Sequence, residues 1–295
     1  MFSELLPFWA KYWYHVIIAI ATCIILTLVF DSPKKRIARK DSPVFGNIYK
    51  PVDENAEDNE DEQEEEYEDP ALPADLKHVP YNHPKYSKEE LLQRASEFYQ
   101  ISSARRTLRF FSPDPVPKEV IREIIKSAGT SPSGAHTEPW TFVAVSNQLL
   151  KSEIRKIVER EEEINYKKRM GMKWTTDLLP LKTNWIKEYL TTAPYLILVF
   201  KQSYGILANG KRKVHYYNEM SVAMACGILL TAIQYSGLVS LSSTPLNCGP
   251  AIRRLLGRPS NEKLVLLLPV GFPAEDATVP ELRRKPLSEI LVEFD

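Results

Sequence analysis

The chain has 295 residues, of which 44% are hydrophobic, so it can bury a sizeable core in one large domain or two smaller ones. Three cysteines without a CxxC pair, and five histidines without metal-ligand spacing, argue against a disulfide framework and a structural metal. The formal net charge is +0, but twelve acids and no Lys or Arg fall within residues 53–69, which leaves +12 on the remainder. A basic folded part suits anionic ligands such as phosphates, although Lys and Arg also solvate ordinary surfaces, and we expect no nucleic-acid partner.

An apolar run at residues 13–30, after a short N-terminal segment at 1–12, holds no acid, Lys or Arg and can just cross a bilayer as a helix. A cleaved signal peptide is the alternative, but the run is longer than a typical signal core and no clean cleavage site follows it. Five basic residues follow the run, whereas Lys11 alone precedes it. The positive-inside rule then predicts a single-pass anchor in the lipid of the plasma membrane or a vesicle membrane, with the C-terminal side in the cytoplasm.

Residues 31–86 are predicted to be a linker that is first basic and then strongly acidic. The acidic stretch cannot bury apolar surface and repels itself, so we expect it to be disordered and extended. It is either a docking tail for a basic partner or a solvated spacer. The near absence of aromatic or periodic residues favours the spacer.

Residues 87–295 form the predicted folded domain. Ser87 begins a capping box, and the apolar residues after it repeat with helical spacing: Leu91, Leu92, Ala95 and Phe98. Further helices are predicted at 117–128, 148–169 and 218–235, and strands at 140–145, 195–200, 238–242 and 263–270. This alternation of helices and strands, without an internal repeat, predicts an α+β or α/β class.

Two features of the domain suit phosphate binding, although the sequence has no GxGxxG, GxxxxGK[ST] or GxSxG motif. Arg105, Arg106 and Arg109 would converge in helix or turn geometry, and guanidinium groups match phosphate oxygens. A solvated basic helix end is the alternative. The loop at 130–135 supplies hydroxyls, a glycine and free amides, as an ordinary helix-to-strand turn also would.

Taken as one set, these features resemble a known family. Arg-Arg-x-x-Arg-Phe, the helix after it, and Ser-Pro-Ser-Gly-x-x-x-x-Pro-Trp leading into a strand are similar to the nitroreductase superfamily of FMN enzymes. The helix around Gly227 and the strand end Pro-Val-Gly-Phe-Pro extend the resemblance over about residues 88–295. It implies an α+β fold with a central mixed sheet flanked by helices, and a domain-exchanged homodimer with FMN at the subunit interface.

The resemblance also implies which residues would hold FMN. The arginine segment would meet the phosphate and the ring edge (Arg105, Arg106, Thr107, Leu108 and Arg109), and Arg284 would add a phosphate contact. The loop residues Pro132, Ser133 and Gly134 would line the flavin, and Ser242, Ser243 and Thr244 would approach it. Family members of this kind often carry three threonines at 242–244, and the two serines here keep the hydroxyls. The Thr244 hydroxyl, donating to the flavin N5, is the expected catalytic group because it would favour one-electron steps.

Residues 131–140 and 244–250 are similar to a branch of the superfamily that dehalogenates tyrosines. This implies reductive release of iodide and tyrosine from mono- and diiodotyrosine, for iodide salvage. Reduced FMN would deliver electrons into the ring while the protein fixes the geometry. NADPH would be the ultimate electron donor, through a separate reductase, because the chain has no dinucleotide fingerprint of its own.

The charged groups of such a substrate imply a binding set. Glu162 would pair with the ammonium, Lys187 and Tyr166 would bind the carboxylate, and the Ala135 amide would donate to the phenolate. Glu162 and Tyr166 share a helix face by their spacing. Glu161 and Glu163 flank Glu162, so the spacing alone does not show which of these three acids would bind the ammonium.

Residues 170–190 are apolar without a clean period, so they are predicted to form either a lid that orders over substrate or a plain surface helix. Two other functions remain open. One is a general FMN nitro- or quinone reductase on a membrane anchor, which would not need Glu162, Tyr166 and Lys187. The other is a membrane-tethered scaffold with a vestigial domain.

Overall fold

The computed structural model describes residues 70–207 and 209–294. The predicted membrane anchor and the whole acidic stretch at 53–69 lie outside these residues. Among the residues described, we find no helix with both the length and the apolar character needed to span a bilayer.

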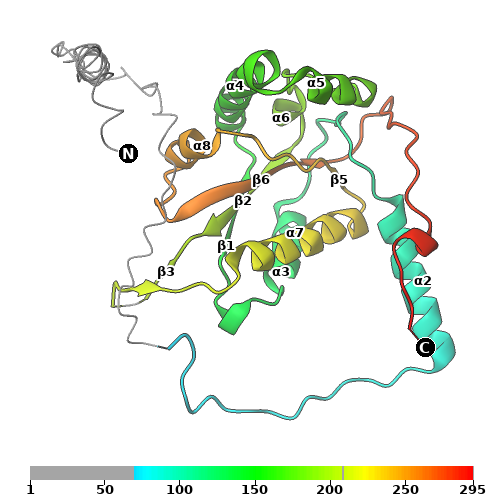
Figure 1. Cartoon of the computed structure of the whole chain (residues 1–295), viewed down its shortest axis with the longest axis vertical. Helices are drawn as coiled ribbons and strands as arrows, with labels where there is room; N and C mark the ends of the chain where they lie inside the picture. Colours follow the sequence, from blue (N-terminus) through cyan, green and yellow to red (C-terminus); the bar gives the residue numbers. More distant parts are fainter. Residues whose placement is uncertain (1–69, 208, 295) are drawn as a thin grey trace, which may run out of the picture. The chain divides into compact units, whose positions relative to one another are not determined.

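A four-stranded sheet lies at the centre of the domain, in the order β1-β2-β6-β5 (Figure 1). Its strands are β1 (Trp140–Val145), β2 (Tyr195–Gln202), β5 (Val239–Ser240) and β6 (Glu262–Gly271). The strands pair antiparallel, with a register shift in the β2–β6 pairing between Val199 and Phe200. Thr107 adds a parallel bridge to Ser240, so the sheet is mixed, as predicted. A separate hairpin is formed by β3 (Gly205–Ile206) and β4 (Arg212–Lys213).

Helices cover both faces of the sheet because β2 alternates two buried sets of side chains. Ile197 and Val199 belong to a core shared with α3 (Lys118–Gly129) and α7 (Asn218–Tyr235). Leu196, Leu198 and Phe200 belong to a second core, shared with α4 (Gln148–Ile164) and α8 (Gly249–Leu255). Burial of each such side chain contributes about 1.5–3 kcal/mol. The two cores therefore hold α4 and α7 firmly on opposite faces.

The segment after α4 leaves the body of the domain as a chain of short elements. α4 continues through a π-helical turn, η2 (Asn165–Arg169), into α5 (Met172–Leu178) and η3 (Leu179–Leu181). The chain then returns through α6 (Tyr189–Thr192) to β2. Met172 and Leu179 are exposed, at 86% and 71% of their surface. An exposed apolar segment of this kind fits the predicted lid, and π-turns are frequent at functional sites.

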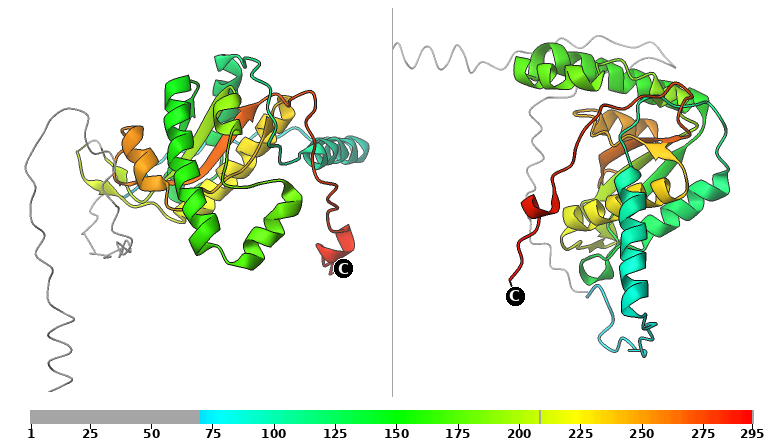
Figure 2. Two further views of the ribbon diagram at one scale, coloured as in Figure 1. Left: turned by 90° about the horizontal axis from the view of Figure 1, so that it is seen from above. Right: turned by 90° about the vertical axis from the view of Figure 1, so that its right-hand side faces the viewer.

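Helix α2 (Lys88–Ala104) and the C-terminal arm, residues 273–294, run along the same side of the domain (Figures 1 and 2). No residue of α2 is buried, and the large apolar side chains of both segments are exposed: Leu91, Leu92, Phe98, Tyr99, Leu282, Leu287, Ile290, Leu291, Val292 and Phe294. The arm contains one 3₁₀ turn, η4 (Leu287–Glu289). The helical stripe predicted after Ser87 is thus present, but in the part of the chain that the structure describes its side chains stay exposed.

The predicted element bounds agree closely with the structure. The capping box at Ser87 is formed, and β1 and α7 begin and end where the sequence placed them. The strand predicted at 238–242 is shorter, because the chain pairs with Thr107 at Ser240 and then with Leu267 at Ser243.

Candidate functional site

The arginine segment is extended, so the helix or turn geometry predicted for Arg105–Arg109 is wrong. α2 ends at Ala104, and Arg105 already has extended dihedral angles of φ −64° and ψ 129°. The Leu108 amide donates to the Ser240 carbonyl at 3.1 Å, which ties the segment to β5. This long-range pairing overrides the local spacing. Arg106 and Arg109 consequently point to different surroundings.

The C-terminal arm closes over the start of the arginine segment. Arg284 donates to the Ser103 carbonyl at 2.8 Å and to the Arg105 carbonyl at 2.9 Å, and Arg106 donates to the Pro280 carbonyl. Guanidinium groups from both ends of the domain therefore gather at the end of α2. Such a donor set fits the phosphate of FMN.

The loop at 131–135 has a backbone that could approach a flat ligand closely. A Cβ at Gly134 would lie 2.7 Å from the Tyr216 carbonyl oxygen, so only glycine fits there. Ala135 follows with a φ of 47°, in the left-handed region that non-glycine residues rarely adopt. Ser133 accepts a hydrogen bond from the Glu138 amide at 3.0 Å, which closes the turn. Pro132 and Ala135 are exposed, so their peptide groups are accessible to a ligand.

The hydroxyl segment at 242–244 directly follows β5. Ser243 exchanges two backbone hydrogen bonds with Leu267 of β6, at 3.2 and 2.8 Å. Ser242 and Thr244, on either side of it, are exposed. The backbone beneath the Thr244 hydroxyl is thus anchored to the sheet while the side chain remains available.

Glu162, Tyr166 and Lys187, from the end of α4, the π-turn and the segment before α6, lie close together. A Glu162 carboxylate oxygen lies 3.6 Å from the Lys187 ammonium, and the two side chains are only 12% and 8% exposed. The ammonium also lies 5.5 Å from the centre of the Tyr166 ring. Asn165, in the π-turn, donates to Glu162 at 3.3 Å. The flanking Glu161 and Glu163 instead pair with Arg169 and Lys167.

The surroundings shift the proton affinities of this group. Burial lowers the pKa of the Lys187 ammonium, and the nearby Glu162 carboxylate opposes that shift. Burial raises the pKa of the Tyr166 phenol, while its hydrogen bond with Thr183 lowers it. The charge of Arg109 acts on both groups. The Arg109 guanidinium is thus near enough for its charge to be felt at Tyr166 and Lys187.

The structure joins most of the predicted residues in one region, with one exception. The arginine segment is connected to residues 242–244 through β5 and to Arg284 through the Arg105 carbonyl, and the charge of Arg109 is felt in the Glu162 group. Among the described residues, no hydrogen bond or ion pair connects the loop at 131–135 to the arginine segment; the loop bonds to itself and to the end of α3.

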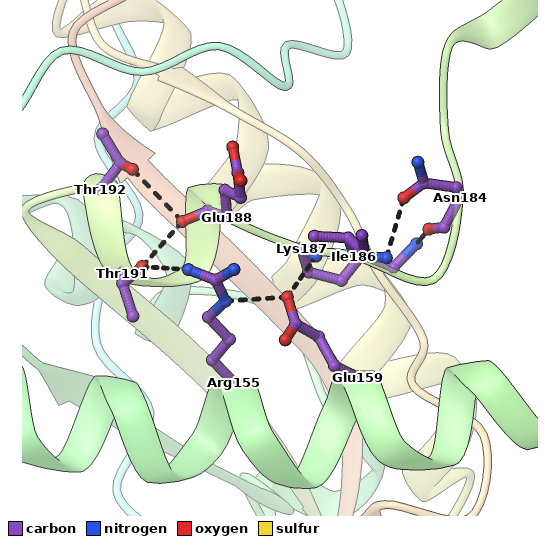
Figure 3. Close-up of polar contacts among 8 residues, drawn as sticks. All are labelled: Arg155, Glu159, Asn184, Ile186, Lys187, Glu188, Thr191 and Thr192. Atoms are coloured by element: carbon purple, nitrogen blue, oxygen red, sulfur yellow. Dashed lines mark hydrogen bonds and ion pairs between the residues drawn. The ribbon is translucent and has the colours of Figure 1, made fainter.

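Three residues near Lys187 were missed by sequence reasoning. Glu159 accepts a hydrogen bond from the Lys187 amide, and Arg155 holds Glu159 (Figure 3). Trp185 packs edge-on against Tyr166, with ring centres 6.1 Å apart. The i,i+4 spacing of Arg155 and Glu159 could have suggested their ion pair, but nothing local points to the distant amide.

The chain is similar to known proteins both in sequence and in fold. The nitroreductase family model matches residues 103–272. The chain is 54% identical to iodotyrosine deiodinase of Danio rerio, over 92% of this chain and 94% of that protein, and 61% identical to iodotyrosine deiodinase 1 of Homo sapiens, over 74% and 75%. A crystal structure of iodotyrosine deiodinase bound to FMN and 3-iodo-L-tyrosine aligns with a TM-score of 0.57 and 30% identity, over 67% of this chain and 98% of that one. The chain therefore belongs to the nitroreductase family and, within it, to the iodotyrosine deiodinases.

Proposed function

We propose that this protein is an FMN-dependent oxidoreductase that removes iodide from mono- and diiodotyrosine and releases tyrosine, a reaction suited to iodide salvage. The observation that carries the proposal is the Glu162–Lys187 pair at 3.6 Å, with Tyr166 beside it. A neutral aromatic substrate has no use for two opposite, nearly buried charges. An amino acid zwitterion does, because it can place its ammonium on one and its carboxylate on the other. The relatives named as iodotyrosine deiodinases support the same substrate.

The residues of this chain would bind and orient the substrate. Glu162 accepts from the substrate ammonium, and Lys187 and Tyr166 donate to its carboxylate, so the internal ion pair is exchanged for two pairs with the zwitterion. The Ala135 amide donates to the phenolate oxygen. Bound FMN supplies the electrons that cleave the carbon–iodine bond. The apolar segment at 170–190 then excludes water from the closed site.

The cofactor would be held by the groups that the structure places around the end of α2 and β5. Arg105, Arg106 and Arg284 bind its phosphate, and Arg109 reaches the ring edge with the backbone of Thr107 and Leu108. The Thr244 hydroxyl would supply a hydrogen-bond donor to the flavin ring, with the Ser242 and Ser243 hydroxyls beside it. Pro132, Ser133 and Gly134 would line the flavin from their separate loop.

A domain-exchanged homodimer would explain why that loop lies apart. α2 and the C-terminal arm expose apolar side chains that a second copy would cover, including Phe98 and Phe294, which are 59% and 95% exposed. The loop at 131–135 of one subunit would then complete the flavin site of the other. Sedimentation of the purified protein should give a dimer, and removal of residues 285–295 should weaken it.

Residues 13–30 would anchor the protein in the membrane lipid of the plasma membrane or a vesicle, with the catalytic domain in the cytoplasm. The apolar length and the five basic residues that follow it support this arrangement. A separate NADPH-dependent reductase would supply the electrons. Extraction of membranes at alkaline pH should leave the full chain in the pellet and release a variant that begins at residue 31.

The activity is tested with the purified full chain in detergent. We expect a yellow protein with flavin absorbance that releases iodide from diiodotyrosine when dithionite supplies the electrons. Nitroarene reduction without iodide release would instead identify a general nitro- or quinone reductase. A colourless protein that binds no FMN would leave only the scaffold function.

A further inference from the structure

Helix α4 carries a row of side chains that hold the segment from Lys187 to Ala193. The Lys151 ammonium donates to the Ala193 carbonyl at 2.7 Å, and Arg155 donates to the Thr191 hydroxyl at 3.0 Å. Glu159 accepts from the Lys187 amide at 2.6 Å (Figure 3). Because these three side chains are each four residues apart, they share one face of α4. The row ends one turn before Glu162.

Glu159 is the member of this row that reaches the substrate group. One carboxylate oxygen, Oε1, accepts both from Arg155, at 2.8 Å, and from the Lys187 amide. Both side chains of the ion pair are about a quarter exposed, at 27% and 26%. A charged acceptor on a backbone amide makes a stronger hydrogen bond than a neutral one.

The Lys187 side chain is fixed from its other end by a turn. The Asn184 side chain accepts from the Ile186 amide at 2.8 Å, and the Asn184 carbonyl accepts from the Lys187 ammonium. The backbone of Lys187 is therefore fixed by α4, while its ammonium is fixed between this turn and Glu162. Without Glu159 the Lys187 amide would lose its acceptor, and the backbone at Lys187 would be held only from its C-terminal side, where the Lys187 carbonyl accepts from the Leu190 amide at 3.0 Å.

We propose that Glu159 is the positioning residue of Lys187: its carboxylate, oriented by Arg155, holds the Lys187 backbone so that the ammonium meets the substrate carboxylate. This inference rests on the proposed function, because it assigns a role through the amino acid end of the substrate. Glu159 then affects how tightly the substrate binds and not the chemical step at the carbon–iodine bond. The substrates concerned are free α-amino acids, because these carry the carboxylate that Lys187 binds.

The test uses the FMN-loaded full chain and measures the Kd of 3-iodotyrosine by quenching of flavin fluorescence. We expect Glu159→Ala to raise this Kd and the KM about tenfold, with kcat within threefold of the unmodified protein. Glu159→Gln should stay within threefold, because its amide oxygen can still accept from the Lys187 amide. 3-Iodotyramine, which lacks the carboxylate, should bind Glu159→Ala and the unmodified protein equally. Glu153→Ala, which breaks an exposed ion pair on the same helix, is the matched control.

Coupling to Lys187 separates positioning from a general structural role. In a Lys187→Met background, Glu159→Ala should add less than a twofold further loss, since both changes remove the same interaction. The proposal would be overturned if the losses of affinity from Glu159→Ala and Lys187→Met were additive, or if Glu159→Ala weakened the binding of 3-iodotyramine as much as that of 3-iodotyrosine. It would also be overturned if Glu159→Gln bound 3-iodotyrosine as weakly as Glu159→Ala does. If Glu159→Ala does not fold, Glu159→Asp takes its place, because its shorter side chain keeps the charge but cannot reach the amide. If the unmodified protein neither binds nor deiodinates 3-iodotyrosine, the proposed function fails instead.

Discussion

Glu162 and Lys187 form an ion pair across 3.6 Å between the end of α4 and the segment that leads into α6, with both side chains nearly buried. A pair in such surroundings gains little stability, because desolvation offsets most of the attraction between the charges. In the proposed function, the pair keeps two charges oriented for a ligand that carries the complementary pair. On binding, the substrate would replace an ion pair within the protein. Because Glu162 and Lys187 are already nearly buried, little further desolvation of their charges would be needed.

Glu162→Gln should weaken diiodotyrosine binding by about ten- to a hundredfold, since it removes a charge-assisted hydrogen bond to the substrate ammonium. FMN affinity should not change. Flavin fluorescence titration measures both. Glu163→Gln is the control, because Glu163 is the next residue and pairs with Lys167 on the exposed side of the helix. Equal losses in the two variants would show that Glu162 has no special role.

Thr244→Ala should keep FMN bound but lose most iodide release, because the hydroxyl that donates to the flavin is removed while Ser243 still anchors the backbone to β6. A loss of at least a hundredfold in kcat is expected for such a transition-state contact, by analogy with about 10²–10³ for one oxyanion-hole donor. Iodide release under dithionite measures it. Thr244→Ser keeps the hydroxyl and should retain activity. Normal turnover by the alanine variant would remove Thr244 from the mechanism.

Arg284→Ala should raise the Kd of FMN about tenfold, since it removes a guanidinium from the phosphate site and the two hydrogen bonds that hold the arm to the end of α2. Equilibrium dialysis with flavin absorbance gives the value. Arg283→Ala removes the same charge one residue earlier and serves as the control. An unchanged FMN affinity in Arg284→Ala would place the arm outside the cofactor site.

Diiodotyrosine should protect residues 170–190 from trypsin, which can cut after the exposed Lys173 and Lys182 of the lid segment. Ordering over the substrate would bury Met172 and Leu179, whose exposure in the free protein leaves that segment accessible. Mass spectrometry of timed digests locates the cuts, and tyrosine without iodine is the control ligand. Cleavage at the same rate with and without diiodotyrosine would favour the plain surface helix.

His215 should make the domain less stable in acid. Burial lowers its pKa to about 4, its Nδ1 has no hydrogen-bond partner among the described residues, and Lys213 adds repulsion. The unfolded chain binds the proton near pH 6.5, so stability is lost as the pH falls from about 6.5 towards 4. The Tm of the unmodified protein should fall over that range, and His215→Gln should flatten the curve. Parallel curves for the two proteins would contradict this assignment.

Local patterns in the sequence predicted the elements whose partners lie nearby. The capping box at Ser87 and the apolar run of α7 are local features, and both begin where the sequence placed them. The arginine segment was predicted wrongly because its shape depends on Ser240, far along the chain, and a spacing of four residues carries no sign of that pairing. The grouping of Glu162 with Tyr166 and Lys187 came from family resemblance; spacing alone did not distinguish Glu162 from its neighbours.

The role proposed for Glu159 could not have been predicted, since its partner is the backbone amide of residue 187. Every residue type except proline has such an amide, so the sequence gives no sign of the contact. The same limit applies to the arm, because Arg284 binds carbonyl groups and leaves no complementary side chain to find. Side chains that bind backbone are therefore the part of this site that residue patterns do not reveal.

The arm also sets the point in folding at which the proposed cofactor site can form. Arg106 finds the Pro280 carbonyl 174 residues later, and Arg284 reaches back 179 residues to Arg105. Contacts so distant along the chain form late, after the loop between them has closed. A folding chain can therefore build its sheet and both cores first, while the proposed phosphate site stays unassembled until the arm has docked on the end of α2.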